Sequence, residues 1–361
     1  MVLSIQSSQK YYIPLAVLSL GTLAFLFLRS RRQERAAVEP SLSQRSISLI
    51  QNIPVVKTVW NYFFPLKTEL SKLGKKELVQ VYEENLRCVE QQYYVNSKGQ
   101  HIPLAHGSKL AANSQVYTIN FLQNDTIRFE RRTTPIEVVV KDSLSAAKEQ
   151  IDLGYKVAVL NFASPSEPGG GIADGTLAQE ETLCYASPEL SSFMTEELTK
   201  SPSRFYPLKK RDAYDSKDRL FVTPNVAICR GNYEQNFQFL DQPFSVGVIS
   251  AAAPCLPKLK INEDKSVSYA NREDEEYMKK CIYAQLAAAY NEDYDCIIIG
   301  AFGCGAFKNP PDHVAKLYHD ELTKLPSSGI LKKIVFAILP DPTTADHNPR
   351  GNLQPFLDLF P

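Results

Sequence analysis

Short apolar runs alternate with longer amphipathic stretches along most of this 361-residue chain. Runs of a few residues that are rich in β-branched side chains are typical of strands buried on both faces of a sheet. Five such runs occur, at residues 156–162, 225–229, 244–250, 296–302 and 333–339. Residues 136–141 are also strand-like, and Asp142 or Ser143 can cap a helix that follows them.

Apolar residues at helical spacing predict helices between these runs. The predicted helices cover residues 73–92, 144–151, 177–187, 271–290 and 310–322. Strands that alternate with helices in this way predict an α/β fold, with helices layered on a mixed sheet. No internal repeat interrupts the pattern, and we expect residues 73–361 to form one domain.

One run near the start of the chain is longer than the others and carries no charge. Residues 11–28, YYIPLAVLSLGTLAFLFL, would span about 27 Å as a helix, close to the hydrocarbon thickness of a bilayer. Four arginines follow within residues 29–35, whereas only Lys10 precedes the run. The positive-inside rule then predicts a single-pass membrane anchor, with the rest of the chain facing the cytoplasm. A cleaved signal peptide is less favoured, because its positive charge would precede the apolar run.

The segments on either side of the predicted anchor have no strand or helix pattern as clear as that of the domain. Residues 1–10 would be a short tail, and residues 29–72 would be a stalk that leads to the domain. The stalk contains a group of aromatic side chains, Trp60, Tyr62, Phe63 and Phe64. These side chains could lie on the membrane surface or pack against the domain, and the sequence leaves both alternatives open.

The overall charge gives no sign of a polyanion partner. Lys and Arg total 40, as do Asp and Glu, so the formal net charge is zero. Nucleic-acid-binding domains are usually basic, so no DNA binding is indicated, and any bound anion must be held by local geometry. The seven cysteines are scattered without a C-x-x-C pair, and no H-E-x-x-H motif is present. We therefore expect neither a disulfide framework nor a metal site.

The stretch GGGIADGTLAQEE, residues 169–181, combines a flexible backbone with two adjacent carboxylates. It follows the predicted strand at 156–162, and ligands of α/β folds bind beyond such strand ends. Backbone amides of glycine loops, with a helix N-terminus behind them, can bind phosphate without any lysine. The helix dipole would stabilise Glu180 and Glu181, which diverge by roughly 100° on a helix. A carboxyl group kept protonated in a closed pocket can act as a general acid at a glycosidic bond.

A second glycine-rich turn, GAFGCGAF at residues 300–307, follows another predicted strand. The two turns could form opposite walls of one cleft. The sequence has no G-x-x-x-x-G-K-[ST] or G-x-S-x-G motif, and GAFGCGAF differs from G-x-G-x-x-G. P-loop, esterase and dinucleotide-binding sites are therefore not indicated.

The triple glycine, a seven-residue spacer and Gln-Glu-Glu together resemble the signature of microbial-type poly(ADP-ribose) glycohydrolases. The flanking LNFASPSEP, the strand end ISAAAP, the second turn GAFGCGAFKNPP and the helical lead-in ELVQVYEENLRCVEQQ are also similar to that family. The resemblance covers residues 73–361. It implies a macrodomain-like mixed sheet sandwiched by helices. It also implies release of ADP-ribose from poly(ADP-ribose) by hydrolysis of ribose–ribose O-glycosidic bonds, with no metal or redox cofactor.

The resemblance also implies roles for individual residues. Glu181 would protonate the ribose–ribose linkage and then activate water, while Glu180 would hydrogen-bond ribose hydroxyls. Gln179 would orient the loop, and Asn161 would support the pocket from its strand end. The remaining implied substrate contacts are Gly169, Gly170 and Gly171 on the diphosphate and distal-ribose side, Gly303, Cys304, Gly305 and Ala306 in the second diphosphate loop, and Phe307 on the ribose.

Two positions depart from the family pattern. Ser164 stands where family members often carry Asn, and Ile172 stands where they often carry an aromatic residue. The departures leave a hydrolase of mono-ADP-ribosylated protein open as an alternative. A membrane-tethered reader of ADP-ribose is a further alternative, although a reader would not need the acid. We expect the partners to be poly(ADP-ribose) or ADP-ribosylated proteins, and the chain to be a monomer.

Overall fold

A computed structural model describes residues 73–122, 134–200, 204–209, 218–324, 331–340 and 344–361. By its internal contacts the chain divides into two units, Met1–Thr68 and Glu69–Pro361, and all of the described residues belong to the second unit. The predicted anchor at 11–28 and the predicted stalk at 29–72 lie outside the described residues. None of the helices in the described ranges combines the length and the apolar character that a membrane crossing requires.

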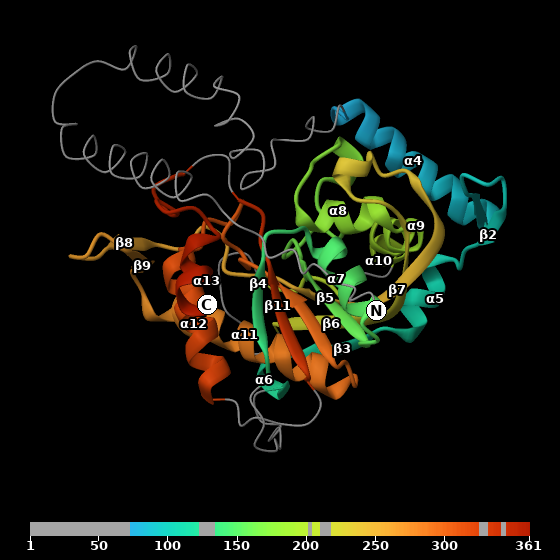
Figure 1. Cartoon of the computed structure of the whole chain (residues 1–361). Coiled ribbons are helices and arrows are strands. Elements are labelled where there is room, and N and C mark those ends of the chain that lie inside the picture. The colour runs from blue at the N-terminus through green and yellow to red at the C-terminus, as the bar shows by residue number, and fades with distance from the viewer. Residues whose placement is uncertain (1–72, 123–133, 201–203, 210–217, 325–330, 341–343) are drawn as a thin grey trace, which may run out of the picture. The chain divides into compact units, whose positions relative to one another are not determined.

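A mixed seven-stranded sheet forms the centre of the domain (Figure 1). Its strand order is β3-β6-β7-β5-β10-β11-β4. The five strands from β7 to β4 run parallel, and β6 pairs antiparallel with both β7 and β3. The strands are β3 (Gln115–Thr118), β4 (Ile136–Val139), β5 (Val157–Phe162), β6 (Arg219–Arg230), β7 (Phe239–Ala251), β10 (Cys296–Ile299) and β11 (Lys333–Ala337).

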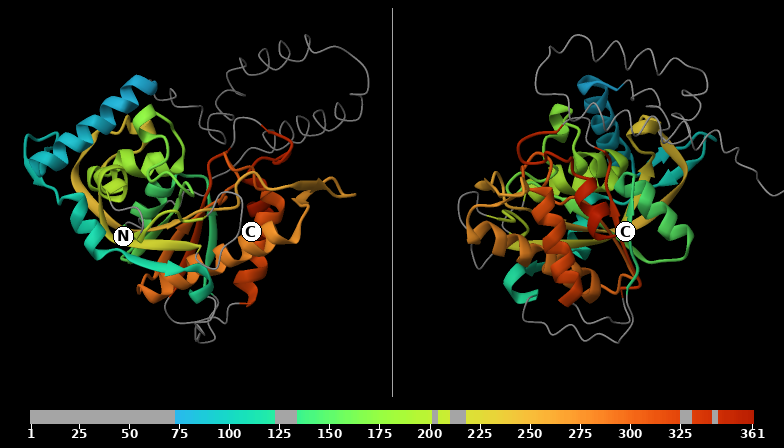
Figure 2. Two further views of the ribbon diagram at one scale, coloured as in Figure 1. Left: turned by 180° about the vertical axis from the view of Figure 1, so that it is seen from behind. Right: turned by 60° about the vertical axis from the view of Figure 1, so that its left-hand side comes forward.

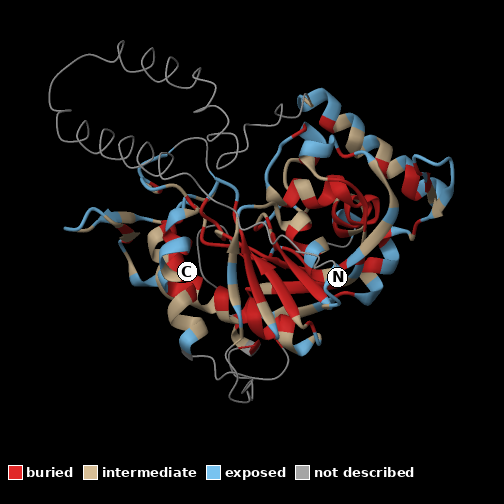
Figure 3. Cartoon of the chain, viewed as in Figure 1, coloured by how far each residue is buried: buried red, intermediate tan, exposed pale blue. Residues whose placement is uncertain are grey.

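The central strands are buried on both faces, as their unbroken apolar runs predict (Figure 3). Alternate side chains of each strand enter two different cores. Ala158 and Leu160 of β5 belong to one core, whereas Val157 and Val159 belong to the other. The sheet therefore separates two apolar layers, each of which is closed by helices.

Helices α7, α8 and α9 contact one side of the sheet, and α11 contacts the other, where α12 and α13 also pack against Phe336 of β11 (Figures 1 and 2). Helices α4 and α5 pack against α9, and α6 packs against α11. Asp142 caps α7, because its carboxylate accepts hydrogen bonds from the amides of Leu144 and Ser145. The helices are α4 (Lys75–Gln91), α5 (Gly107–Asn113), α6 (Ile119–Leu122), α7 (Ser143–Asp152), α8 (Gln179–Ala186), α9 (Pro188–Ser192), α10 (Leu198–Lys200), α11 (Arg272–Asn291), α12 (Pro311–Lys324) and α13 (Gln354–Leu359).

Two predicted strands are parts of a much longer hairpin. The runs at 225–229 and 244–250 lie within β6 and β7, which are 12 and 13 residues long. The prediction that both runs are buried on both faces is wrong, because Asn225 is exposed at a register shift and Ser245 is exposed further along the hairpin. Only the half of the hairpin near β5 lies between the two cores. The run at 296–302 is also shorter than predicted, since β10 ends at Ile299 and a turn follows.

Two short hairpins outside the main sheet complete the described strands. β1 (Tyr93–Val95) pairs with β2 (His101–Pro103), and β8 (Leu259–Ile261) pairs with β9 (Val267–Tyr269). The first hairpin follows α4 directly, and the second lies between β7 and α11 in the chain. Each contributes a buried tyrosine, Tyr94 or Tyr269, to the packing of the domain.

Candidate active site

Helix α8 begins beside the carboxyl end of β5, and a glutamine side chain joins the two. Gln179 accepts a hydrogen bond from the Phe162 amide at 2.9 Å, and its side-chain amide donates to the Leu160 carbonyl at 2.7 Å. The glutamine thus satisfies backbone groups that the shorter neighbouring strand β10 leaves at the end of β5. The next two residues, Glu180 and Glu181, are only 4% and 5% exposed.

Glu180 is surrounded by hydrogen-bond donors from the end of β5 and from the loop after it. The Ser164 amide donates to Oε2 at 2.8 Å, and the Gly169 amide donates to Oε1 at 3.2 Å. The side-chain amide of Asn161 lies 3.4 Å from Oε1 and 3.1 Å from the Ser250 hydroxyl of β7. Asn161 therefore links the carboxyl group to two neighbouring strands.

Glu181 turns back over the start of its own helix. The Gly171 amide donates to Oε1 at 2.8 Å, and the Ala178 amide donates to Oε2 at 3.2 Å. The second contact is the return half of a capping box, in which the third helical residue accepts from the N-cap amide. Each carboxylate oxygen is held by one backbone N–H, so the position of the group is fixed.

The triple glycine shapes the space in which the two carboxyl groups meet. Gly170 has φ +59°, and its amide donates to the Glu167 carbonyl at 3.0 Å. A Cβ atom on Gly170 would lie 2.4 Å from Oε1 of Glu181 and 3.2 Å from Oε2 of Glu180. Both carboxyl groups thus converge over a residue that must lack a side chain.

The structure differs from the sequence-based expectation about these glycine amides. A phosphate cradle needs free N–H groups, yet the amides of residues 169–171 donate to Glu180, to Glu167 and to Glu181, in that order. The loop therefore holds carboxylates with the donors that were expected to hold phosphate. Whether Gly169, Gly170 and Gly171 also line the substrate stays a prediction.

The second glycine turn is held in place by a buried asparagine that the sequence analysis missed. Gly303 has φ +73°, and a Cβ atom there would lie 2.5 Å from Cβ of Ala253. The side chain of Asn309 donates to the carbonyls of Gly303 at 2.9 Å and Pro254 at 2.8 Å. Tyr269 in turn donates to Oδ1 of Asn309 at 2.8 Å. The turn is thereby fixed to the segment that follows β7.

Residues along this turn face different surroundings. Cys304 is fully buried and its amide donates to the Ala301 carbonyl, so neither its thiol nor its amide faces outward. Gly305 and Ala306 are exposed, and within the described ranges their amides have no hydrogen-bond acceptor. Phe307 is half-buried and packs against the core. The donors suited to an anion are therefore those of Gly305 and Ala306.

The two turns leave neighbouring strands at the same edge of the sheet. β5 and β10 are parallel partners, so their carboxyl ends lie together. Phe162, the last residue of β5, and Phe302, in the turn after β10, meet edge to face with ring centroids 5.7 Å apart. The carboxyl pair at the start of α8 and the exposed amides of the second turn therefore both lie beyond the carboxyl ends of these two adjacent strands.

Comparison with protein families identifies this arrangement. Residues 82–231 match the family model of the microbial-type PARG catalytic domain, where PARG is poly(ADP-ribose) glycohydrolase. Residues 82–231 thus match the microbial-type PARG catalytic domain, and the domain of residues 73–361 is called the PARG domain below after this match. The matched residues include both carboxyl groups and the first glycine loop of the PARG domain, and they end before the second. Among curated proteins, none matches the chain.

Solved bacterial structures share the fold of the PARG domain. Poly(ADP-ribose) glycohydrolase from Thermomonospora curvata superimposes with a TM-score of 0.64 at 24% identity, covering 79% of this chain and 100% of that one. The same enzyme bound to the inhibitor ADP-HPD gives 0.62 at 24% identity, covering 78% and 99%. The Deinococcus radiodurans enzyme in complex with ADP-ribose gives 0.56 at 24% identity, covering 71% and 97%.

Burial changes the pKa of one of the two carboxyl groups in the PARG domain. Burial raises the pKa of Glu180 from its ordinary value of 4.5 to about 8, and the nearby charge of Glu181 raises it further, while hydrogen bonds from Ser164, Asn161 and Gly169 act in the opposite direction. Two adjacent carboxyl groups out of water do not readily ionise together. The pair therefore retains one proton near neutral pH.

The raised pKa of Glu180 predicts that the PARG domain loses stability as the pH rises. The contribution of the neutral carboxyl is fully present below the unfolded-state pKa of about 4.5 and is lost as the pH rises through the folded-state value of about 8. The loss should amount to a few kcal/mol, on the order that such a shift implies. Melting temperatures measured between pH 5 and pH 9 should fall in the wild type and stay flatter in Glu180→Gln.

The control for this experiment is Glu83→Gln on α4, where the side chain is exposed. It should melt with the same pH dependence as the wild type. An unchanged fall in Glu180→Gln would show that Glu180 is not the titrating group.

Several residues that build the PARG site were not singled out from the sequence. Tyr185 of α8 donates to the carbonyls of Ile172 and Thr176 and so ties the glycine loop to the helix. His347 makes a 2.9 Å contact with the Cys304 carbonyl through Nε2. For Asn309 the sequence offered one signal, the motif KNPP after the second turn, because an Asn before Pro is common in turns. Ile172, predicted as a departure at the ligand, is buried in the core.

Proposed function

We propose that the chain hydrolyses poly(ADP-ribose) at ribose–ribose O-glycosidic bonds, with Glu181 as general acid and then general base. The observation that carries the proposal is the convergence of two buried carboxyl groups, Glu180 and Glu181, over Gly170. Paired carboxyl groups of which one holds a proton are the usual means of breaking a glycosidic bond. The family of the domain and its fold support the same reaction.

In the proposed reaction Glu181 donates a proton to the ribose oxygen that leaves as the C–O bond breaks. The carbon that loses this bond develops positive charge, which an anionic carboxylate stabilises. The Glu181 carboxylate then removes a proton from the water that attacks this carbon, which regenerates the acid. With the one proton of the pair on Glu181, the ionised Glu180 would accept a hydrogen bond from a ribose hydroxyl and so orient the sugar.

We further propose that the second loop binds the diphosphate and the ribose next to the bond that is cleaved. The exposed amides of Gly305 and Ala306 can donate to phosphate oxygens, and Phe307 can pack on the sugar. The carboxylate-filled glycine loop at 169–171 would instead set the position of the acid. Relatives solved with ADP-ribose and with ADP-HPD support this class of ligand for the present chain.

The function is tested by incubating the purified chain with poly(ADP-ribose) and separating the products by chromatography. Free ADP-ribose should accumulate with time. Intact polymer together with measurable ADP-ribose binding would replace the hydrolase with a reader. Release of ADP-ribose from mono-ADP-ribosylated protein alone would replace the substrate class.

We also propose that residues 11–28 anchor the chain in a membrane as a single span, with the catalytic domain on the cytoplasmic side. The support is the uncharged run and the arginines that follow it. The full-length chain should stay in the membrane pellet after an alkaline carbonate wash, and protease added outside sealed vesicles that keep their cytoplasmic face outward should digest the domain. Quantitative release by carbonate, or protection of the domain, would contradict the anchor or its orientation.

A further inference from the structure

The C-terminal end of the catalytic helix α8 is buried, and a neighbouring helix supplies part of its hydrogen bonds, beside the Ser187 amide that also donates to the Cys184 carbonyl. The last carbonyls of a helix have no partner within it, and leaving them unpaired in the core is costly. Asn85 of α4, which is fully buried, donates to the carbonyls of Cys184 at 3.2 Å and Tyr185 at 3.0 Å. Its side-chain amide also lies 3.2 Å from the Ser191 hydroxyl, which itself donates to Cys184.

A buried arginine holds this asparagine in its orientation. Nε of Arg230, at the end of β6, donates to Oδ1 of Asn85 at 2.7 Å. The same guanidinium donates to the Phe237 carbonyl at 2.9 Å and to Glu84 at 2.7 Å, and its centre lies 3.5 Å from the ring centroid of Phe239. Only 4% of Arg230 is exposed. The amide of Asn85 cannot turn over without placing a donor against this guanidinium.

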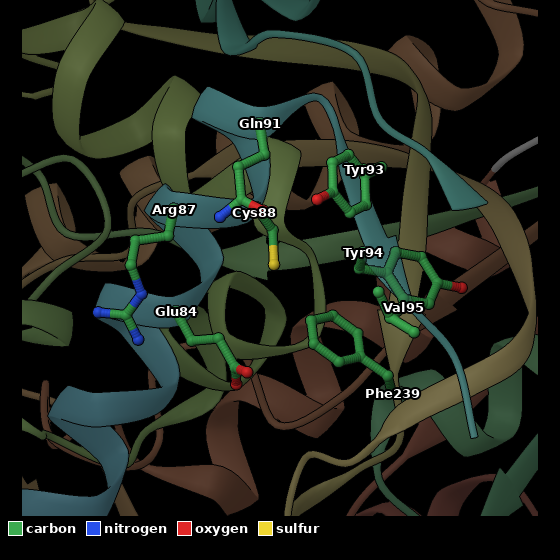
Figure 4. Close-up of a pocket in the computed structure, with 8 residues that line it drawn as sticks. All are labelled: Glu84, Arg87, Cys88, Gln91, Tyr93, Tyr94, Val95 and Phe239. Atoms are coloured by element: carbon green, nitrogen blue, oxygen red, sulfur yellow. The ribbon is translucent and has the colours of Figure 1, made fainter. Parts of the chain in front are cut away.

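The arginine and the asparagine together are called the α8 clamp below. A small pocket of about 240 Å³, which Figure 4 shows, lies beside the clamp, although neither Asn85 nor Arg230 lines it. Glu84, the ion-pair partner of Arg230, and Phe239, on which the guanidinium stacks, both line that pocket. Asn85 and Arg230 themselves are both buried.

The α8 clamp acts on the end of the helix opposite to the two carboxyl groups. Helix α8 has only eight residues, with Glu180 and Glu181 in its first turn and the clamped carbonyls of Cys184 and Tyr185 in its last. So short a helix moves as one body when either end shifts. Tyr185 also hydrogen-bonds the glycine loop, so a displacement of the helix end would reach that loop as well.

We propose that Asn85 and Arg230 are positioning residues, which set the place of Glu180 and Glu181 by holding the far end of α8. Neither residue touches the carboxyl groups. The consequence of this positioning for turnover rests on the proposed hydrolase function. The charged guanidinium of Arg230 polarises the amide of Asn85, and this strengthens the positive end of the amide dipole that faces the carbonyl end of α8. Such positive charge complements the helix dipole.

The test uses Asn85→Leu, which keeps the branched shape, removes every donor and acceptor, and adds no titrating group. Because misplacement of a reacting group by about 1 Å can cost roughly 100-fold, kcat for release of ADP-ribose should fall between about 10-fold and 100-fold. KM should change much less, since the proposed diphosphate donors lie on another loop. The pH at which the Glu180-dependent loss of melting temperature occurs should also move, because the surroundings of that carboxyl change.

A buried control separates positioning from loss of stability. Leu286→Ala on α11 creates a cavity in the other core, and it should lower the melting temperature while leaving kcat and the pH dependence of melting unchanged. Arg230→Lys is the milder variant should Asn85→Leu not fold, because lysine keeps the charge but cannot reach three acceptors. It should shift kcat and the pH dependence of melting in the same direction by a smaller amount.

The outcomes distinguish the positioning role from the proposed function. A lower melting temperature with wild-type kcat and a wild-type pH dependence of melting in the clamp variants would overturn the positioning role. A wild-type chain that releases no ADP-ribose would overturn the hydrolase function. In that case the pH dependence of melting, which needs no activity, still decides whether the clamp positions the carboxyl pair.

Discussion

Glu181→Gln should lose about 10²- to 10⁴-fold in turnover, the usual scale for removal of a general acid–base group, while still binding ADP-ribose. Glutamine keeps the size of the side chain and an oxygen that can accept from the Gly171 amide. It has no acidic proton to deliver to the leaving ribose. Turnover on poly(ADP-ribose) and calorimetric binding of ADP-ribose are the two measurements.

Glu180→Gln is the matched comparison, because it removes the adjacent carboxyl group of the same helix. It should lower turnover less than Glu181→Gln, through looser positioning of the ribose. Near-normal turnover by Glu181→Gln would remove this residue from the chemical step. A collapse of binding as large as the collapse of rate would show that Glu181 is mainly structural.

Gly170→Ala should lose about 100-fold or more in turnover, because one added methyl group displaces the acid. The new Cβ would lie 2.4 Å from Oε1 of Glu181 and 3.1 Å from its Cδ, so the carboxyl group would have to leave its place between two amides. The backbone at φ +59° adds strain for any residue with a Cβ. Steady-state turnover and melting temperature should be measured together.

Gly99→Ala supplies the control for backbone strain. Gly99 lies in the turn between β1 and β2 at φ +73°, and a Cβ atom there would have no other atom within 4 Å. Gly99→Ala should therefore cost stability, roughly 1–2 kcal/mol, and leave turnover unchanged. Equal turnover in Gly170→Ala and Gly99→Ala would mean that the space above Gly170 does not hold the acid.

The central layers of the fold could be predicted from the sequence because burial leaves a local pattern. The runs at 156–162 and 333–339 contain β5 and β11, whose unbroken apolar character is typical of parallel strands. The short strand β3 and the outer half of the β6–β7 hairpin lack that pattern, since tertiary pairing holds them and water reaches parts of them. The order of strands in the sheet could not be predicted from the sequence either, because strand pairing depends on contacts between residues far apart in the chain.

The site was predictable in its composition and only partly in its arrangement. The resemblance selected Gln179, Glu180 and Glu181, and the structure brings all three to the end of β5. The sequence could not say which acceptor the glycine amides would take, because an N–H group donates equally well to phosphate or to carboxylate. Asn85 left no local signal, since it acts on a segment distant in the chain, and Asn309 left only the Asn-Pro pair of the KNPP motif.

The order of strands in the sheet also determines when the site can form during synthesis. β5 lies between β7 and β10, and the outermost parallel pair joins β4 to β11 across about 200 residues of chain. Closing such long loops is slow and comes late in folding. A growing chain that ends before Cys296 already carries the triple glycine and both glutamates, yet one edge of β5 has no partner. Until β10 leaves the ribosome, that apolar edge stays open to chaperones, so the residues of the signature are all present before the site can form.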